Sequence, residues 1–336
     1  MKIAVLGATG LVGRTMLRLL EAADWMTGVP VALASARSAG SAIPFRDGTL
    51  ACREVGACSF DGVDVALFSA GGGPSRQWAP VAAEAGAWVV DNSSAWRMDP
   101  DVPLIVPEIN GDLAPVLTDG HGGGIIANPN CSTIQIVMAV APCHRLFGVK
   151  ACHVTTLQAV SGAGQAAVDE LYRQEANPDG DHSASAFPRT IARNVLPAIG
   201  VPLDDGSYEE EAKVVREMRK ILGRAEDLKV SCTATRVPVV TGHSAAVRLV
   251  CDAPVDLAAA REALAAWPGM MVAEGPHDFH TAREMAGRNE VAVSRLRTDP
   301  DDPHALLMWV VADNLLKGAA WNAVQIAERL AGAGSR

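Results

Sequence analysis

The sequence predicts an α/β fold with two domains, a doubly wound parallel sheet followed by a second α+β domain with a mostly antiparallel sheet. Three observations predict it. Short apolar runs alternate with helical patterns through residues 1–130, as in βαβ units. A glycine-rich turn follows the first of these runs. Beyond about residue 151 the apolar runs follow one another with fewer helices between them, as in an antiparallel sheet.

The elements of the first domain follow from these runs in order. The sequence predicts strands at KIAVLG, VPVALAS, VDVALFSA, WVVDNSS and GGGIIANP, and helices over 11–23 and 74–85. The last segment, DNLLKGAAWNAVQIAERL, returns to a helical period. We expect this helix, over 314–336, to pack back onto the first domain, which then comprises it and residues 1–130.

The second domain is expected to comprise residues 131–313. The sequence predicts strands at VTTLQAV, VSCTATRVPVV, AAVRLVCD, EVAVSRLR and ALLMWVVA, and helices over 165–176, 209–222 and 256–266. These helices are expected on one face of the sheet, because an antiparallel sheet commonly packs only one face against its core.

Composition excludes several classes of protein. The chain has 336 residues, 49% of them hydrophobic, which excludes a disordered chain and suits an α/β enzyme. A net charge of −9 gives no basic field for nucleic acid or for an anionic membrane. No apolar run approaches the roughly 18 residues of a membrane helix, and the first run is too short for a signal peptide. We therefore expect a cytoplasmic protein with neither a nucleic-acid nor a membrane partner.

The cysteines predict no metal site. Seven cysteines stand without any CxxC pair, which fits reduced thiols better than a disulfide framework or a zinc centre. The pairs CH at 143–144 and CH at 152–153 match no zinc spacing, and HDFH at 277–280 is interpreted as a loop.

The turn GATGLVG carries a cofactor hypothesis. Gly7, Gly10 and Gly13 directly follow an apolar strand and open a helix, the context of a Rossmann dinucleotide-binding turn. Small residues let the backbone approach a pyrophosphate, and the helix N-terminus offers it N–H groups. The alternative is a glycine-rich turn that binds nothing. A further glycine cluster, FSAGGG at 68–73, follows another strand and is expected to pass the cofactor at the same sheet edge.

The end of the second strand favours NADP over NAD. An NAD site usually places an acidic residue there to accept from the ribose hydroxyls, whereas this strand runs into SARSAG. Ser35, Arg37 and Ser38 offer one cation and two hydroxyls, which suit a 2′-phosphate. The alternative for Arg37 is a solvated surface group.

Cys131 stands where a thiol becomes reactive. It follows the turn NPN and precedes Ile134, Val137 and Met138, whose spacing is that of one helix face. Cys131 is therefore expected at a helix N-terminus, where unpaired N–H groups and the helix dipole favour a thiolate. The alternative is a buried, inert cysteine.

The motifs together resemble the aspartate-semialdehyde dehydrogenase family. GATGLVG, SARS, FSAGG, DNSSAWRMD, VPEIN, NPNCST, QAVSGAG, EEAK, RVPVVTGHS and DNLLKGAA follow the family's order over nearly the whole chain. The resemblance implies NADPH-dependent reduction of aspartyl phosphate to aspartate semialdehyde and phosphate, a step in the biosynthesis of lysine, threonine and methionine. It also implies a homodimer, with catalysis and dimerisation in the second domain.

The resemblance assigns roles to single residues. Cys131 is the nucleophile that forms the acyl-enzyme, Gln158 helps to hold the acyl group, and His243 is the proton-transfer residue. The residues implied to bind the substrate are Arg236 for its α-carboxylate, Glu210 for its ammonium, Arg97 and Lys213 for its phosphate, and Asn130. The residues implied to bind the cofactor are Gly7, Thr9, Gly10, Leu11, Val12, Gly13, Ser35, Arg37, Ser38, Ser69, Gly71, Ser161, Gly162 and Asn314.

Spacing supports these roles to different degrees. Glu210 and Lys213 share a helix face, although a solvated helix surface is the alternative. Arg236 and His243 can meet one small ligand only if the chain turns between them, and the intervening proline and glycine allow that. The family commonly has an acidic residue after GHS, where this chain has Ala245, so this chain lacks the carboxylate that the resemblance would supply there.

Two other functions remain open. One is a related acyl-phosphate reductase acting on N-acetylglutamyl phosphate, which would not need Glu210 for an ammonium. The other is a non-catalytic paralogue that keeps the fold for binding or assembly. The presence of Cys131, Gln158, Arg236 and His243 together argues against the second.

Overall fold

The chain forms two compact units. The computed structural model describes residues 1–26, 28–117, 122–178, 180, 186–224 and 227–333. Unit 1 comprises Met1–Asn130 and Ala319–Arg336, and unit 2 comprises Cys131–Gly318. The boundary expected at 313/314 lies instead at 318/319, because residues 314–318 stay with unit 2: the Asn314 side chain accepts from the N–H of Gly242, and Gly318 adjoins Cys131.

Unit 1 is built on a parallel sheet of six strands in the order β5-β2-β1-β6-β7-β8. All its pairings are parallel, as the alternating pattern predicts. Its strands are β1 (Ile3–Leu6), β2 (Val31–Ala34), β5 (Arg53–Glu54), β6 (Val65–Phe68), β7 (Trp88–Asp91) and β8 (Gly124–Ala127). A hairpin of β3 (Ala42–Phe45) and β4 (Gly48–Ala51), which the apolar runs did not predict, precedes β5.

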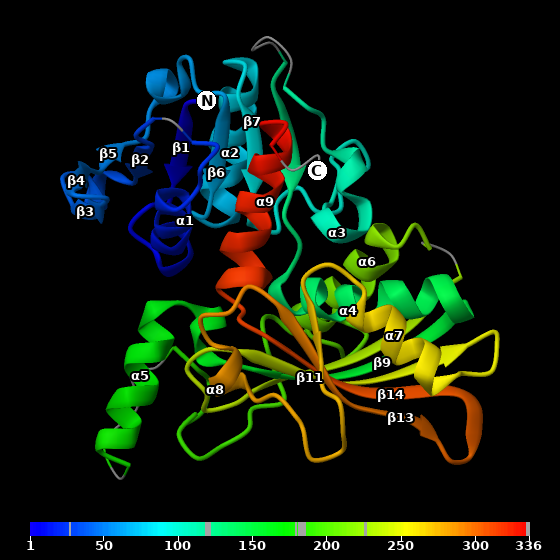
Figure 1. Ribbon diagram of the computed structural model, residues 1–336. Coiled ribbons are helices and arrows are strands. Elements are labelled where there is room, and N and C mark those ends of the chain that lie inside the picture. Colours follow the sequence, from blue (N-terminus) through cyan, green and yellow to red (C-terminus); the bar gives the residue numbers. More distant parts are fainter. Residues whose placement is uncertain (27, 118–121, 179, 181–185, 225–226, 334–336) are drawn as a thin grey trace. The chain divides into compact units, whose positions relative to one another are not determined.

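Helices cover both faces of this sheet (Figure 1). Helices α1 (Leu11–Glu21) and α9 (Trp321–Leu330) share one apolar core with β1, which confirms that the last helix packs onto the first domain. Helix α2 (Gly72–Glu84) covers the other face, where Phe60 and Phe68 lie with ring centroids 5.8 Å apart. The remaining helical elements of unit 1 are η1 (Ala36–Ser38), η2 (Ala57–Phe60), α3 (Pro107–Asn110) and η3 (Gly111–Leu113).

Unit 2 is built on a mixed sheet of six strands in the order β10-β9-β11-β14-β13-β12. The central pairings are antiparallel, as predicted, and the two edge pairings are parallel. The strands are β9 (Val149–Gln158), β10 (Lys229–Arg236), β11 (His243–Cys251), β12 (Met270–Val272), β13 (Val291–Asp299) and β14 (Asp302–Ala312).

Helices α4 (Cys131–Phe147), α6 (Glu209–Ile221) and α7 (Leu257–Ala265) lie on one face of this sheet (Figure 1). The expectation that all helices share that face is wrong in one place. The short helix α8 (Ala282–Met285) lies against the other face, where Met285 packs on Ala292 and Val311. The other helical elements of unit 2 are η4 (Val160–Ala163), α5 (Gln165–Ala176) and the π-helix η5 (Leu316–Ala320), which ends in unit 1.

The face of the unit 2 sheet opposite α4 is largely exposed. Thr155 and Ala246 are exposed there, and the register places them in one cross-strand row with Trp309 of β14. Ala245 points the other way and is fully buried between β9 and β14, so an acidic residue at this position would be buried in the sheet.

A glycine of the first turn tests how closely α1 packs on the strand before it. An alanine Cβ at Gly13 would lie 2.2 Å from the carbonyl oxygen of Gly7, so Gly13→Ala should destabilise unit 1 by about 3 kcal/mol in urea unfolding. Gly73→Ala is the matched control, because a Cβ there meets nothing within 4 Å. Equal midpoints for the two variants would show that the turn tolerates the extra methyl group.

Candidate active site

Cys131 is the first residue of helix α4, as the sequence predicts. Residues 132–140 of this helix are buried, while Cys131 itself is half-buried. The first N–H groups of a helix lack carbonyl partners within it, and the dipole adds positive charge, so a thiolate is favoured at this position. A Cβ at Gly318 would lie 3.0 Å from the Cβ of Cys131, so a larger residue there would crowd the nucleophile.

Arg236 ends β10 and His243 begins β11, and the chain turns between them. Gly242 takes a φ of +98° in this turn, a conformation that suits glycine. A Cβ at Gly162 would lie 2.9 Å from Nη1 of Arg236 and 3.1 Å from Nε2 of His243. Arg236 and His243 therefore meet beside Gly162, as the turn prediction requires.

The Arg236 guanidinium is a buried charge in unit 2. It is only 5% exposed, and its Nη1 donates to the carbonyl oxygen of Ala159 over 2.8 Å. Burial lowers the pKa of Arg236, while the charges of Cys131 and Glu210 oppose that shift. An arginine guanidinium keeps its proton in proteins, so the site has a buried cation near the nucleophile.

Helix α6 carries Glu210, whose charge acts on Arg236, and Lys213, which pairs with Glu210. The Nε2 of Gln158 lies 3.3 Å from Oε1 of the buried Glu210 and donates to it. The Nζ of Lys213 lies 3.7 Å from Oε2 of Glu210 and 3.0 Å from Oε1 of Glu209. The predicted shared face of Glu210 and Lys213 is thus confirmed.

Glu211 is a residue of this site that sequence analysis missed. Its carboxylate accepts the N–H of Tyr208 at the start of α6 over 2.8 Å and that of Ala234 in β10 over 2.9 Å. It thereby fixes the helix that carries Glu210 against the strand that carries Arg236. The only sequence signal is a glutamate in the first turn of α6, where it completes a capping box.

His243 is fully buried. Its Nδ1 accepts the N–H of Ala159 over 3.0 Å, and its Nε2 has no hydrogen-bond partner among the described residues. Burial lowers the pKa of His243 well below its ordinary value, and the charge of Arg236 lowers it further. The imidazole is therefore neutral at pH 7.

The turn after β1 in unit 1 has the tight backbone geometry that a dinucleotide site requires. Gly7 takes a φ of +85°, and a Cβ there would lie 2.3 Å from the carbonyl oxygen of Ser69. The N–H of Gly7 donates to Leu33 of β2, and α1 starts directly after Gly10. An exposed Gly10 at a helix N-terminus fits a pyrophosphate.

The other residues predicted for the cofactor in unit 1 lie around this turn. Ser35, Arg37 and Ser38 follow β2, which pairs with β1; Arg37 and Ser38 form η1 with Ala36, and Arg37 is exposed. Thr9, Leu11 and Val12 are half-buried at the start of α1. Ser69 follows β6, and Gly71 caps α2 with a φ of +84°.

Arg97 and Asn130, predicted to bind phosphate and substrate, are buried in unit 1. Arg97 Nε donates to the carbonyl oxygen of Asn128 over 2.9 Å, and Nη2 donates to that of Asn92 over 3.0 Å. A buried amide network continues from Asn128 to Asn322 of α9 over 2.7 Å. These contacts hold the segment that leads into Cys131. Lys213, the other predicted phosphate ligand, belongs to unit 2.

Three residues predicted for the cofactor, Ser161, Gly162 and Asn314, lie in unit 2. The Nδ2 of Asn314 donates to Oγ of Ser161 over 2.9 Å, and its Oδ1 accepts the N–H of Gly242 over 2.9 Å. Asn314 therefore joins the loop of Gly162 to the turn before His243. In the sequence only the motif DNLL marked Asn314, and that motif does not show that its partners are Ser161 and Gly242.

Neither a metal cluster nor a membrane span occurs among the described residues. No group of three or more His, Cys, Asp or Glu side chains gathers there as a metal site would require. Nor does any described helix have the length and hydropathy needed to cross a membrane.

Two family models match the chain. The one described as semialdehyde dehydrogenase, NAD binding domain, matches residues 2–114, and the one described as semialdehyde dehydrogenase, dimerisation domain, matches residues 140–317. The aspartate-semialdehyde dehydrogenase of Aquifex aeolicus is 46% identical over 98% of this chain and 97% of its own. That of Bacillus subtilis is 42% identical over 98% and 96%.

Solved structures show the same similarity. Aspartate semialdehyde dehydrogenase II of Vibrio cholerae, complexed with ASA, superposes with a TM-score of 0.91 at 41% identity over 98% of this chain and 97% of that one. The enzyme of Candida albicans with NADP superposes with a TM-score of 0.74 at 25% identity over 98% of both.

Gly162 tests whether the space beside Arg236 admits an anion on its way to Cys131. A methyl group there would displace Nη1 of Arg236, so Gly162→Ala should slow alkylation of Cys131 by iodoacetate about tenfold more than by neutral iodoacetamide, as expected for a charge-assisted contact. Mass spectrometry of the Cys131 peptide gives both rates. Gly275→Ala, with nothing within 4 Å of the added Cβ, is the control. An unchanged ratio would separate Gly162 from the anion path.

Proposed function

Because the chain belongs to the aspartate-semialdehyde dehydrogenase family, we propose that it reduces aspartyl phosphate to aspartate semialdehyde and phosphate through a thioester on Cys131, with NADPH as reductant. The enzyme is an oxidoreductase of amino-acid biosynthesis that uses a nicotinamide cofactor. The observation that carries the proposal is the cluster of charges around Arg236, which suits one zwitterionic, acylating substrate.

Each end of the substrate has a group of suitable charge in unit 2. Arg236 can hold the α-carboxylate with two parallel hydrogen bonds, and Glu210 can accept from the ammonium. The sulfur of Cys131 then attacks the acyl carbon, and the carbon–oxygen bond to phosphate breaks. When bound, the nicotinamide ring supplies the hydride that reduces the thioester carbon. The carbon–sulfur bond then breaks and returns the thiolate.

The surroundings of Glu210 distinguish a reductase of aspartyl phosphate from one of N-acetylglutamyl phosphate. Glu210 is buried and linked to Gln158, and its charge is felt by Arg236. An N-acetyl group has no charge to balance a buried carboxylate, whereas an ammonium does. This arrangement supports aspartyl phosphate over N-acetylglutamyl phosphate.

The direct test runs the reaction in reverse. The protein is mixed with aspartate semialdehyde, phosphate and NADP, and NADPH absorbance is followed. We expect a signal that requires phosphate. A folded protein that binds NADP but gives no phosphate-dependent signal would support the non-catalytic alternative.

Replacing the nucleophile tests the thioester step. Cys131→Ser should fold and bind NADP as the wild type does but lose turnover by a factor of at least about 10³, because a hydroxyl is a far weaker nucleophile at neutral pH. Steady-state rates of the wild type and Cys131→Ser measure the loss, and thermal unfolding of both proteins checks that the variant is folded. A substantial remaining rate would remove Cys131 from the mechanism.

Arg37 is the proposed basis of the NADP preference. The similar enzyme of Candida albicans was solved with NADP, and Arg37 is exposed in η1 beside the glycine turn. Arg37→Ala should weaken NADP relative to NAD by about 1.4–2.8 kcal/mol, or roughly tenfold to a hundredfold in kcat/KM, because it removes a charge-assisted contact with phosphate. Equal losses with both cofactors would place Arg37 away from the 2′-phosphate.

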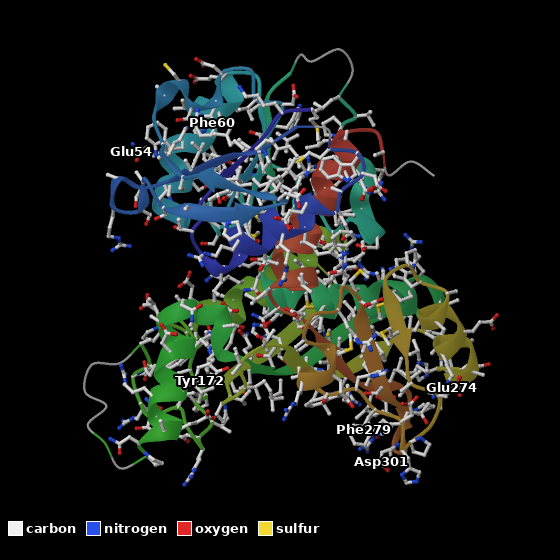
Figure 2. All side chains as sticks on the ribbon, turned by 60° about the vertical axis from the view of Figure 1, so that its left-hand side comes forward. Glu54, Phe60, Tyr172, Glu274, Phe279 and Asp301 are labelled. Carbon is white, nitrogen blue, oxygen red and sulfur yellow. The ribbon has the colours of Figure 1, made fainter. Side chains whose placement is uncertain are left out.

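We also propose that unit 2 forms a homodimer through the exposed face of its sheet. The dimerisation-domain model covers this sheet. A cavity of about 310 Å³ on that face is lined by Trp309, Ala282 and Phe279, and Phe279 is 54% exposed at the surface (Figure 2). An apolar surface of this kind is typical of an interface.

The seven unpaired cysteines suit the reducing cytoplasm.

A charge on this face should break the dimer. Ala246 is exposed in the middle of the sheet, so Ala246→Glu should leave the fold intact but raise the dimer dissociation constant at least about a hundredfold, since an unpaired charge in an interface is costly. Light scattering after size exclusion measures it. Ala258→Glu, at an exposed position of helix α7, should leave the mass of the dimer unchanged. Dimers in both variants would point to another interface.

A further inference from the structure

Helix α5 of unit 2 buries two polar side chains, those of Glu170 and Gln174, one turn apart. By contrast, Tyr172 of the same helix is 54% exposed (Figure 2). A buried polar side chain is costly unless it is hydrogen-bonded. Glu170 and Gln174 therefore indicate that a facing segment is held in a fixed position.

Both side chains bind main-chain N–H groups of residues 186–192. Oε1 of Gln174 accepts the N–H of Ile191 over 2.9 Å and that of Ala192 over 3.0 Å. Nε2 of Gln174 donates to Oε1 of Glu170 over 2.7 Å, and Oε2 of Glu170 accepts the N–H of Ala186. Residues 186–192 form neither a helix nor a strand, so α5 supplies partners that a regular element would otherwise provide.

The chain takes a strained turn directly after this anchor. Arg193 has a φ of +58°, in the left-handed region that residues with a side chain rarely adopt. Such a conformation persists only where the surrounding contacts hold it. The bonds to Gln174 fix the residues before Arg193, and the pairing of Leu196 fixes the residues after it.

Leu196 pairs with the main chain of Arg236. The N–H of Leu196 donates to the carbonyl oxygen of Arg236 over 2.9 Å, and the N–H of Arg236 donates to that of Leu196 over 2.8 Å. Strand β10 is an edge strand of its sheet. Leu196 therefore takes the place of a neighbouring strand at the residue that carries the guanidinium.

We propose that Gln174 is a positioning residue for carboxylate recognition. It holds residues 191–196 in place, and Leu196 thereby holds the main chain of Arg236 where the guanidinium reaches the substrate's α-carboxylate. This inference rests on the proposed function, because it assigns a cause to the position of the arginine named there. Gln174 acts through Leu196 and does not itself contact the substrate.

Both ends of Arg236 are fixed by this arrangement. Its Nη1 donates to the carbonyl oxygen of Ala159 over 2.8 Å, and its main chain is bound to Leu196. The loop of Gly162, which borders Nη1 of Arg236, leads directly into α5. A side chain held at both ends has few conformations to lose when it binds a carboxylate with two parallel hydrogen bonds.

Hydrogen exchange tests the structural step without turnover. Gln174→Met keeps the length of the side chain but removes the acceptor of Ile191 and Ala192. In NMR spectra the amide of Arg236 should then exchange at least about tenfold faster, because its partner segment opens more often. The amide of Ala234, which Glu211 binds, should keep its wild-type rate. An unchanged rate at Arg236, or equal acceleration along all of β10, would overturn the proposal.

Gln165→Met is the matched control. Gln165 is exposed on the same helix, and its Nε2 donates to Oδ1 of Asp169 over 2.7 Å. Its replacement should leave both the exchange of Arg236 and the kinetics at wild-type values. A change as large as that in Gln174→Met would assign the effect to α5 as a whole and overturn the role of Gln174.

Substrate kinetics test the functional step. Gln174→Met should lower kcat/KM for aspartate semialdehyde about tenfold, mainly through KM, because the carboxylate is held less firmly. The kcat/KM for an analogue without the α-carboxylate, and the Kd for NADP, should stay within about twofold of wild type. Equal losses with both substrates would show that Gln174 only stabilises the fold, and would overturn the proposal.

The two measurements separate this inference from the proposed function. A wild-type protein without phosphate-dependent activity would refute the proposed function, whereas wild-type exchange at Arg236 in Gln174→Met would refute the positioning by Gln174 in an active enzyme.

A milder variant covers the case in which Gln174→Met does not fold. Replacing the amide N–H of Ala192 with an ester oxygen, by incorporation of lactic acid, removes one of the donors to Gln174 without adding bulk. Exchange at Arg236 should then be about threefold faster, and kcat/KM for aspartate semialdehyde about threefold lower. Wild-type values of both would overturn the proposal.

Discussion

A buried cation organises the functional half of this protein. Arg236 is almost wholly removed from water, and a charge in that position is tolerated only when it is paired and hydrogen-bonded. The Ala159 carbonyl, Glu210 and Cys131 supply that compensation from three different elements of unit 2. The same compensation prepares the site for its substrate, because a guanidinium that is held in place loses little freedom when a carboxylate binds.

The demands of this cation explain features that otherwise look unrelated. Glu211 ties α6 to β10, so that Glu210 stays in range of Arg236. Gly162 leaves open the space that Arg236 and His243 both face. Asn314 joins the loop of Gly162 to the turn before His243. The contacts of Glu211 and Asn314 fix the distances between elements that are far apart in the sequence. Such fixed distances hold a bound substrate in the geometry that reacts.

Much of this arrangement was predictable from sequence, and the limits have physical causes. The parallel sheet, the start of α4 at Cys131 and the shared face of Glu210 and Lys213 follow from apolar periodicity and helix spacing, which are local signals. The β3–β4 hairpin was missed because Pro44 and the exposed Thr49 break its apolar pattern. The role of the Ala159 main chain was also missed, because a backbone group leaves no mark in the choice of side chain. Parallel edge strands likewise depend on distant pairing that no local pattern encodes.

The central claim is that Arg236 recognises the substrate's α-carboxylate and thereby places the acyl carbon at Cys131. The most direct measurement compares kcat/KM of the wild type and Arg236→Lys for aspartate semialdehyde and for an analogue that lacks the α-carboxylate. Lysine keeps the charge but loses the two-pronged geometry. We predict a loss of about 10²-fold or more with aspartate semialdehyde and a much smaller loss with the analogue. If Arg236→Lys discriminates between the two substrates as strongly as the wild type does, Arg236 is not the carboxylate ligand and the claim is wrong.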